Sequence, residues 1–225
     1  MAGDSPGLVS AQKVFAALGV YDDLLAMGVE VVEFHAGEQR SGRAFRSIDL
    51  AVEPFAADVV INLPKMKTHG MMTLTMGVKN LYGCVAGRRK ATYHLHVKES
   101  RELFAGLMAD ICDAVAPALT ILDGVVAMEG EGPGSGDPRK VGLVAASRSP
   151  VALDLVAAWI LGYTVDEVPI LKEYARRYAE RGELLDAEVT GDDWQSFEVK
   201  NWKRASAFPL SFKIPGWIRR PLRRF

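Results

Sequence analysis

Cysteine and long apolar runs are scarce in this sequence of 225 residues. The two cysteines, Cys84 and Cys112, are too few for a disulfide framework, a Cys-rich zinc site or a four-thiolate iron–sulfur cluster, and we interpret them as buried free thiols. No apolar run approaches the roughly 18 residues of a membrane-spanning helix, and the N-terminus lacks the apolar core of a signal peptide. We therefore expect a cytoplasmic protein without a transmembrane segment.

Acidic residues are missing from one long segment. Residues 59–98 contain no Asp or Glu, although the chain has 28 acidic residues and about five would be expected there by composition. The same segment carries seven Lys or Arg residues and three of the four histidines. Such a segment is solvated, pairs with acids from elsewhere, or binds an anionic partner, and we favour the last. The formal net charge of the chain is −1, so the basic character is local and is offset by acids elsewhere. We therefore expect neither generic nor specific nucleic-acid binding.

Strand-like and helix-like segments alternate along the chain, which predicts an α/β fold with a mainly parallel sheet sandwiched by helices. The predicted strands cover 29–34, 45–52, 58–63, 119–122 and 140–146. The predicted helices cover 8–18, 22–27, 73–81, 99–115, 151–161 and 169–181. We interpret residues 1–200 as a single α/β domain and 201–225 as a basic aromatic tail. Its end, 212–225, is either solvated or contacts a partner domain or an anionic surface.

The loop after the predicted strand 58–63 is the first candidate site, because ligands collect at the carboxyl ends of strands in such sheets. In an extended chain Lys65, Lys67 and His69 point to one side, where two ammonium groups and an imidazole can bind a carboxylate or phosphate. We assign His69 as the acid/base, because neighbouring lysines favour its neutral form. Lys79, the second catalytic candidate, follows in the next predicted helix. The alternative is a solvated loop, with Lys79 extending to solvent.

Further basic residues follow Gly83. We assign substrate binding to Lys65, Lys67, Asn80, Arg88 and Lys90. His94 and His96 form an H-x-H pair, which puts both imidazoles on one face of a strand, a spacing compatible with a transition metal but common by chance. We predict that one cleft is lined by Lys65, Lys67, His69, Lys79 and at least one of His94 and His96.

A glycine-rich acidic loop at 128–138 is the other candidate. It is neither a G-x-G-x-x-G fingerprint nor a Walker loop, so nucleotide binding by these devices is not expected. The acids around it, Asp123, Glu129, Glu131 and Asp137, either neutralise the basic segment across the cleft, act as acid/base groups, hold a hard cation, or belong to a solvated surface loop. Asp154 opens the predicted helix 151–161, and we interpret it as favouring the positive end of that helix.

Three stretches carry a resemblance to a known family: ADVVINLPKMKTHGMMTLTMGVKNLYG, GRRKATYHLH and LTILDGVVAMEGEGPGSGDPRKVGLVAASRSPVALDLVAAWILGY. They closely resemble the domain of unknown function 362 family over roughly 57–163, and GDSPG at 3–7 is similar to a further family segment. The resemblance implies a basic α/β core that is often joined to an iron–sulfur ferredoxin module. Family chains usually begin with a further strand region, so this chain is either a fragment or a short member. Its sheet is then expected to lack an edge strand, and its iron–sulfur partner to be a separate protein.

A looser resemblance concerns mechanism. The order of His69, Lys79 and His94 is similar to that of nickel-pincer lactate racemases, although the Gly-Gly before that family's lysine is Gly77-Val78 here. The resemblance implies an acid/base role for His69, a cofactor or substrate anchor at Lys79, and a metal ligand at His94 or His96.

Two functions follow. The first is an enzyme that binds a small anionic substrate in a Lys/His-lined cleft and performs acid/base or metal-assisted chemistry. The alternative is a non-catalytic module that docks an iron–sulfur or other redox partner through its basic face. The sequence leaves open the substrate, the presence of a metal and the oligomeric state, a homo-oligomer included.

Overall fold

The computed structural model describes residues 1–6, 9–87, 89–98 and 100–206, and the largest sheet in this part has five strands. They are β5 (Ile61–Asn62), β6 (Lys65–His69), β7 (Thr73–Thr75), β8 (Leu119–Glu129) and β9 (Asp137–Ser147). β5 and β6 follow one another along β8, and both are parallel to it. β7 pairs antiparallel with β6, so that Lys67 lies opposite Thr75 and His69 opposite Thr73.

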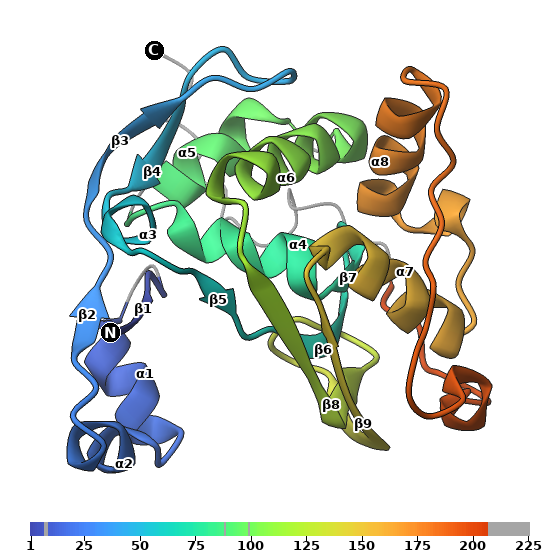
Figure 1. Cartoon of the computed structure of the whole chain (residues 1–225), viewed down its shortest axis with the longest axis horizontal. Helices are drawn as coiled ribbons and strands as arrows, with labels where there is room; N and C mark the ends of the chain where they lie inside the picture. The colour runs from blue at the N-terminus through green and yellow to red at the C-terminus, as the bar shows by residue number, and fades with distance from the viewer. Residues whose placement is uncertain (7–8, 88, 99, 207–225) are drawn as a thin grey trace, which may run out of the picture.

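β8 and β9 form a long antiparallel hairpin, in which Thr120 lies opposite Ser147 and Glu129 opposite Asp137. Figure 1 shows this hairpin at the lower edge of the molecule, beside β6. The predicted α/β class is confirmed, and the sheet is mixed rather than mainly parallel. The antiparallel share is larger than predicted because the strand that starts at Leu119 continues through Asp123-Gly124 and returns directly as β9.

Residues before 57 form two small strand pairs. β1 (Ala2–Asp4) is parallel to β2 (Val31–Glu33), and β3 (Ala36–Arg40) is antiparallel to β4 (Ile48–Ala51). The helices of this part are α1 (Ala11–Ala17), α2 (Tyr21–Ala26) and α3 (Glu53–Ala56). Figure 1 shows them in blue and cyan, on the side of the molecule away from the last two helices. β4 anchors this part, because Ile48 and Leu50 are fully buried in the core.

The remaining helices are α4 (Gly77–Asn80), α5 (Arg89–His96), α6 (Arg101–Val115), α7 (Pro150–Ile160) and α8 (Pro169–Ala179). Short 3-10 helices are η1 (Leu81–Cys84), η2 (Val165–Glu167) and η3 (Trp194–Phe197). The starts of α6 and α7 are fixed by serine caps: the hydroxyls of Ser100 and Ser149 accept hydrogen bonds from the third backbone N–H beyond them. None of the helices in the described ranges is long and apolar enough to cross a membrane.

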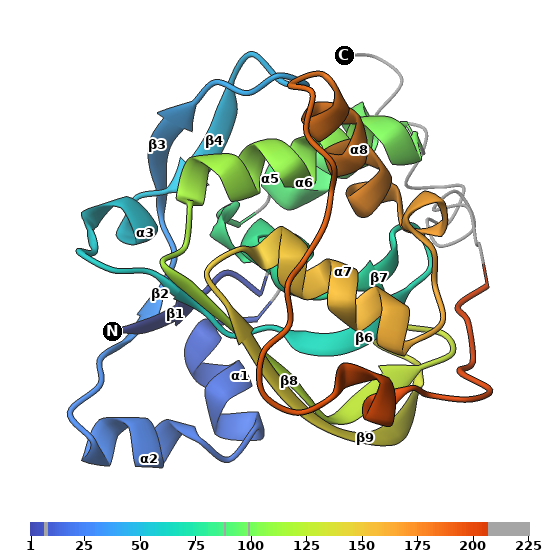
Figure 2. The same cartoon turned by 45° about the vertical axis from the view of Figure 1, so that its right-hand side comes forward.

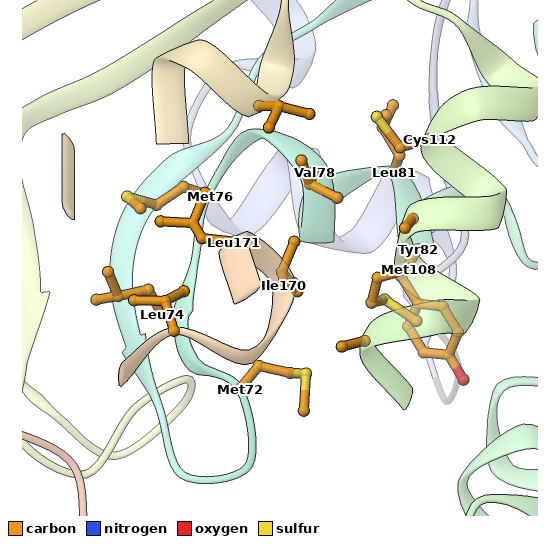
Figure 3. Packing of buried hydrophobic residues seen from close by; sticks show 14 of the residues in the cluster. Met72, Leu74, Met76, Val78, Leu81, Tyr82, Met108, Cys112, Ile170 and Leu171 are labelled. Carbon is orange, nitrogen blue, oxygen red and sulfur yellow. The ribbon is translucent and has the colours of Figure 1, made fainter. Parts of the chain in front are cut away.

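The core lies between the sheet and these helices. Figure 2 shows α7 in front of β6 and β8, with α6 and α8 above it. Figure 3 shows Leu74 and Met76 from the β7 region beside Leu171 of α8. Burial of each such side chain contributes about 1.5–3 kcal/mol. On the other face of the sheet Ile61, Leu63 and Val144 are exposed, so helices cover one face at this point rather than both.

Two predicted elements are wrong. The predicted helix 73–81 is a strand followed by two short helical turns, because Leu74 and Met76 alternate inward with Thr73 and Thr75 outward. The segment that carries the H-x-H pair is not a strand but the helix α5. The segment 65–69, expected as an extended loop, is the strand β6. Its side chains alternate as expected, with Lys65, Lys67 and His69 half-buried and the residues between them buried.

Candidate functional site

Lys79 lies in the very short helix α4, whose start is fixed by buried polar contacts. The carboxylate of Asp154, on α7, accepts hydrogen bonds from the backbone N–H groups of Gly77 at 2.6 Å and Val78 at 3.0 Å. A side chain at Gly77 would clash with this carboxylate, since an added Cβ would lie 2.8 Å from its oxygen. The amide of Asn62 donates to the Gly77 carbonyl at 2.8 Å. These contacts fix α4 against β5 and α7, and thereby set the direction of Lys79.

The ammonium group of Lys79 lies between two aromatic rings. Its Nζ atom is 5.5 Å from the ring centre of Tyr82 and 5.8 Å from that of Phe104. Burial, and next the charges of Lys90 and Lys67, lower the pKa of Lys79 to about 8. The aromatic faces stabilise the cation only partly, because each such contact contributes about 0.5–1 kcal/mol.

Lys90 and His94 reach the same place from α5. The Nζ atom of Lys90 is 5.9 Å from the Tyr82 ring centre and donates to the carbonyl of Ser5. Burial lowers its pKa, although Asp4, Cys84 and Glu33 act in the opposite direction. The hydroxyl of Tyr82 donates to the Lys90 carbonyl at 2.8 Å, which ties η1 to the start of α5.

The imidazole of His94 packs against the same two rings, with ring centres 4.6 Å from Phe104 and 5.7 Å from Tyr82. Burial, and next the charge of Lys79, lower the pKa of His94 to about 4, so the ring is neutral at pH 7. Its Nδ1 atom is buried and makes no hydrogen bond to the described part of the chain. We call Lys67, Lys79, Lys90 and His94 the basic cluster.

The basic cluster contains three cationic side chains and no acidic one. Among the described residues, no carboxylate forms an ion pair with Lys67, Lys79 or Lys90. All three side chains are half-buried, so water compensates their charges only in part. Such a site favours an anion, and the lowered pKa of Lys79 also gives it a neutral amine that can act as a base or nucleophile near neutral pH.

His69 stands at the end of β6, where its ring organises a turn. Its Nδ1 atom accepts hydrogen bonds from the backbone N–H groups of Met71 and Met72, both at 3.1 Å. A neutral imidazole with an accepting Nδ1 carries its proton on Nε2. These hydrogen bonds orient the ring, and the acid/base role of His69 stays a prediction.

Several of the predicted site residues are engaged elsewhere. Lys65 forms an ion pair with Asp123 at 2.7 Å, so one acid does neutralise part of the basic segment. Asn80 donates to the side chain of Asn62 at 2.8 Å. His94 and His96 do not face one another on the helix: His96 is exposed, and its ring centre is 5.9 Å from that of Phe45.

No group of three or more His, Cys, Asp or Glu side chains suited to a metal occurs in the ranges that the structure describes. Arg88 lies outside those ranges, as does 212–225, the end of the predicted tail 201–225.

The acids of the glycine-rich loop contact the end of the described chain. The carboxylate of Glu129, which is buried, accepts from the backbone N–H of Lys203 at 3.1 Å. Glu131 accepts from the backbone and hydroxyl of Ser206 at 3.1 and 2.6 Å. Asp137 forms an ion pair with the Lys203 ammonium at 2.8 Å. Three of the four acids thus hold the segment 203–206 along the hairpin.

Two side chains of the candidate site escaped the sequence argument, and a third was misinterpreted. Tyr82 and Phe104 were not singled out, because aromatic residues in apolar segments are usually core residues. Asp154 was interpreted as favouring the positive end of its own helix, but it is the fifth residue of α7 and caps α4. The one available signal was its position on an otherwise apolar helix, where a carboxylate needs a buried partner.

Comparison with known proteins agrees with the family resemblance of the three sequence stretches. Residues 1–159 match the family described as "Domain of unknown function (DUF362)". The chain is 38% identical over 227 residues to "Thylakoid-associated protein sll1697" of Synechocystis, an alignment that covers 99% of this chain and 70% of that protein. No solved structure is significantly similar. The chain therefore belongs to the domain of unknown function 362 family.

Proposed function

We propose that the protein binds a small anion, a carboxylate or a phosphate, at the basic cluster. One observation carries this proposal: the charges of Lys67 and Lys90 act on Lys79, and none of the three lysines forms an ion pair with a carboxylate among the described residues, although Asp4 and Glu33 act on Lys90 from farther away. Three converging cations repel one another, and a bound anion removes this repulsion. An anion there is held by charge-assisted hydrogen bonds in partly dehydrated surroundings, where such bonds are strong.

We further propose that the protein is an enzyme that acts on this anion, with His69 in acid/base chemistry. The hydrogen bonds accepted by Nδ1 orient the ring, and His69 is proposed as the acid/base group of the reaction. His69→Gln retains an acceptor for the backbone N–H groups but cannot transfer a proton. Once an activity is known, we expect this variant to bind the anion normally and to lose turnover. Near-normal turnover would remove His69 from the mechanism.

The proposed anion site is tested by isothermal titration calorimetry with inorganic phosphate and with oxalate at constant ionic strength. We expect Lys79→Met to weaken binding at least about tenfold, which corresponds to about 1.4 kcal/mol. The matched control is Lys65→Met, which removes a lysine of the same segment that is already paired with Asp123. Binding that is unchanged in Lys79→Met, or weakened equally in both variants, contradicts the proposed site.

The alternative is that the basic face docks an iron–sulfur or other redox protein. The half-buried positions of Lys67, Lys79 and Lys90 favour a small ligand over a broad protein surface. Salt separates the two functions, because exposed charges at a docking surface are screened strongly and a partly buried site is screened less. We also propose a cytoplasmic location, in which the buried thiols Cys84 and Cys112 remain reduced. The relative's name associates that protein with thylakoids.

A further inference from the structure

The surroundings of Lys79 suit covalent chemistry as well as charge. Its amine lies between the rings of Tyr82 and Phe104, and no described carboxylate holds it as an ammonium ion. Amines that are desolvated by apolar groups and placed beside other cations are activated as nucleophiles, because the neutral form is favoured. Lys67 and Lys90 are these cations here, and burial together with their charges brings the pKa of Lys79 to about 8.

We propose that Lys79 forms an imine with the carbonyl carbon of a small 2-oxo acid, whose carboxylate is held by Lys67 and Lys90. This inference rests on the proposed anion site and names the class of its ligand. A 2-oxo acid, which has a carbonyl next to a carboxylate, fits both the unpaired cations of the basic cluster and the desolvated amine of Lys79. The carboxylate supplies the missing negative charge, and the carbonyl supplies an electrophile for the only amine that the two aromatic rings enclose among the described residues.

The step balances without a further reactant. The lone pair of the neutral Lys79 amine attacks the carbonyl carbon, a C–N bond forms, and the C=O π electrons move to oxygen. A proton passes from nitrogen to this oxygen and gives a carbinolamine. The hydroxyl then takes up a proton from solvent and leaves as water, while the nitrogen lone pair forms the C=N bond. The product is a protonated imine, and one water is released.

Charge predicts which carbonyl compounds react. The protonated imine adds a fixed positive charge beside Lys67 and Lys90, which is unfavourable in partly buried surroundings. The carboxylate of a 2-oxo acid compensates this charge, whereas a neutral ketone or aldehyde does not. Pyruvate and glyoxylate should therefore react at Lys79 much faster than acetone or acetaldehyde of similar size.

The test is reductive trapping. The full chain is incubated with pyruvate and sodium cyanoborohydride near pH 8, and the modified lysines are identified by peptide mass spectrometry. We expect modification of Lys79 at least about tenfold faster than of the exposed Lys172, because Lys79 lies beside two further cations that hold the carboxylate and its pKa is lowered to about 8. Oxalate should slow the reaction at Lys79 and leave that at Lys172 unchanged. Both lysines are measured in the same wild-type molecule, so the comparison does not depend on the folding of a variant.

Lys79→Met and Lys65→Met serve as matched variants, the first losing the specific adduct and the second retaining it. Equal modification of Lys79 and Lys172 overturns the imine, as does equal reactivity of acetone and pyruvate. If oxalate then still binds by calorimetry and Lys79→Met abolishes this binding, the anion site stands and only its covalent chemistry is wrong. If oxalate and phosphate do not bind at all, the proposed function fails as well.

Discussion

Replacing Lys79 by methionine should make the ligand-free protein more stable while abolishing its anion site. Methionine has a similar length and is apolar, so it fills the space between Tyr82 and Phe104 without leaving a cavity. The substitution removes a cation that burial, Lys90 and Lys67 all disfavour. A gain in stability on replacement of a native side chain is unusual, but it is typical of sites that hold charge for function.

The magnitude follows from the pKa of Lys79. A fall from the usual 10.5 to about 8 corresponds to at most about 3 kcal/mol against the charged form. Lys79 is only half-buried, so solvent screening reduces this amount, and the lost cation–π contacts remove about 0.5–1 kcal/mol each. We therefore expect the free energy of unfolding at pH 7 to rise by about 1 kcal/mol.

The lowered pKa of Lys79 also fixes how the stability of the wild type changes with pH. Between pH 8 and 10.5 the folded wild type binds fewer protons at Lys79 than the unfolded chain, so its stability rises with pH through this range. The advantage of Lys79→Met should shrink over the same range and vanish above it. Urea unfolding in low salt, followed by tryptophan fluorescence, measures both effects.

Lys65→Met is the control, because Lys65 is partly exposed and paired with Asp123. It should change stability by less than about 1 kcal/mol, with no such trend between pH 8 and 10.5. Added phosphate should stabilise the wild type and the control but not Lys79→Met, since only a folded state with the site is stabilised by ligand. A loss of more than about 1 kcal/mol at pH 7 in Lys79→Met would refute the reasoning and make Lys79 a structural residue.

The absence of acids from 59–98 was the most informative feature of the sequence, because charge imbalance is a local property. It singled out a segment in which the charges of Lys67 and Lys90 act on the buried amine of Lys79 and lower its pKa. It could not show that Lys65 is neutralised, since Asp123 is 58 residues away and reaches it only through the register of β6 on β8. Pairing across a sheet depends on register, and register is decided by the whole sheet.

The histidines show the limit of spacing arguments. The H-x-H pair has the same spacing in any conformation, but the two rings share a face only in a strand. In α5 they separate, so that His94 enters the aromatic core and His96 stays exposed. The choice of helix depends on contacts with distant residues, such as the hydrogen bond that the backbone N–H of Asp49 donates to the Tyr93 hydroxyl at 2.8 Å.

Two further predictions concern buried acids and their partners. Burial raises the pKa of Asp154 to about 7 despite its hydrogen bonds from Val78 and Gly77, so its contribution to stability is fully present below about pH 4 and is lost as the pH rises through 7. The free energy of unfolding of the wild type relative to Asp154→Asn should therefore fall by at most about 4 kcal/mol between pH 4 and 7, and a flat difference in urea unfolding would contradict the pKa. Arg177 is buried and pairs with the buried Asp110 at 2.6 Å, so Arg177→Met leaves an uncompensated carboxylate and should cost about 3–5 kcal/mol. The neighbouring Arg176 is exposed, and Arg176→Met should cost less than about 1 kcal/mol. Equal losses in the two arginine variants, measured by thermal and urea unfolding, would mean that burial of the ion pair does not decide its contribution.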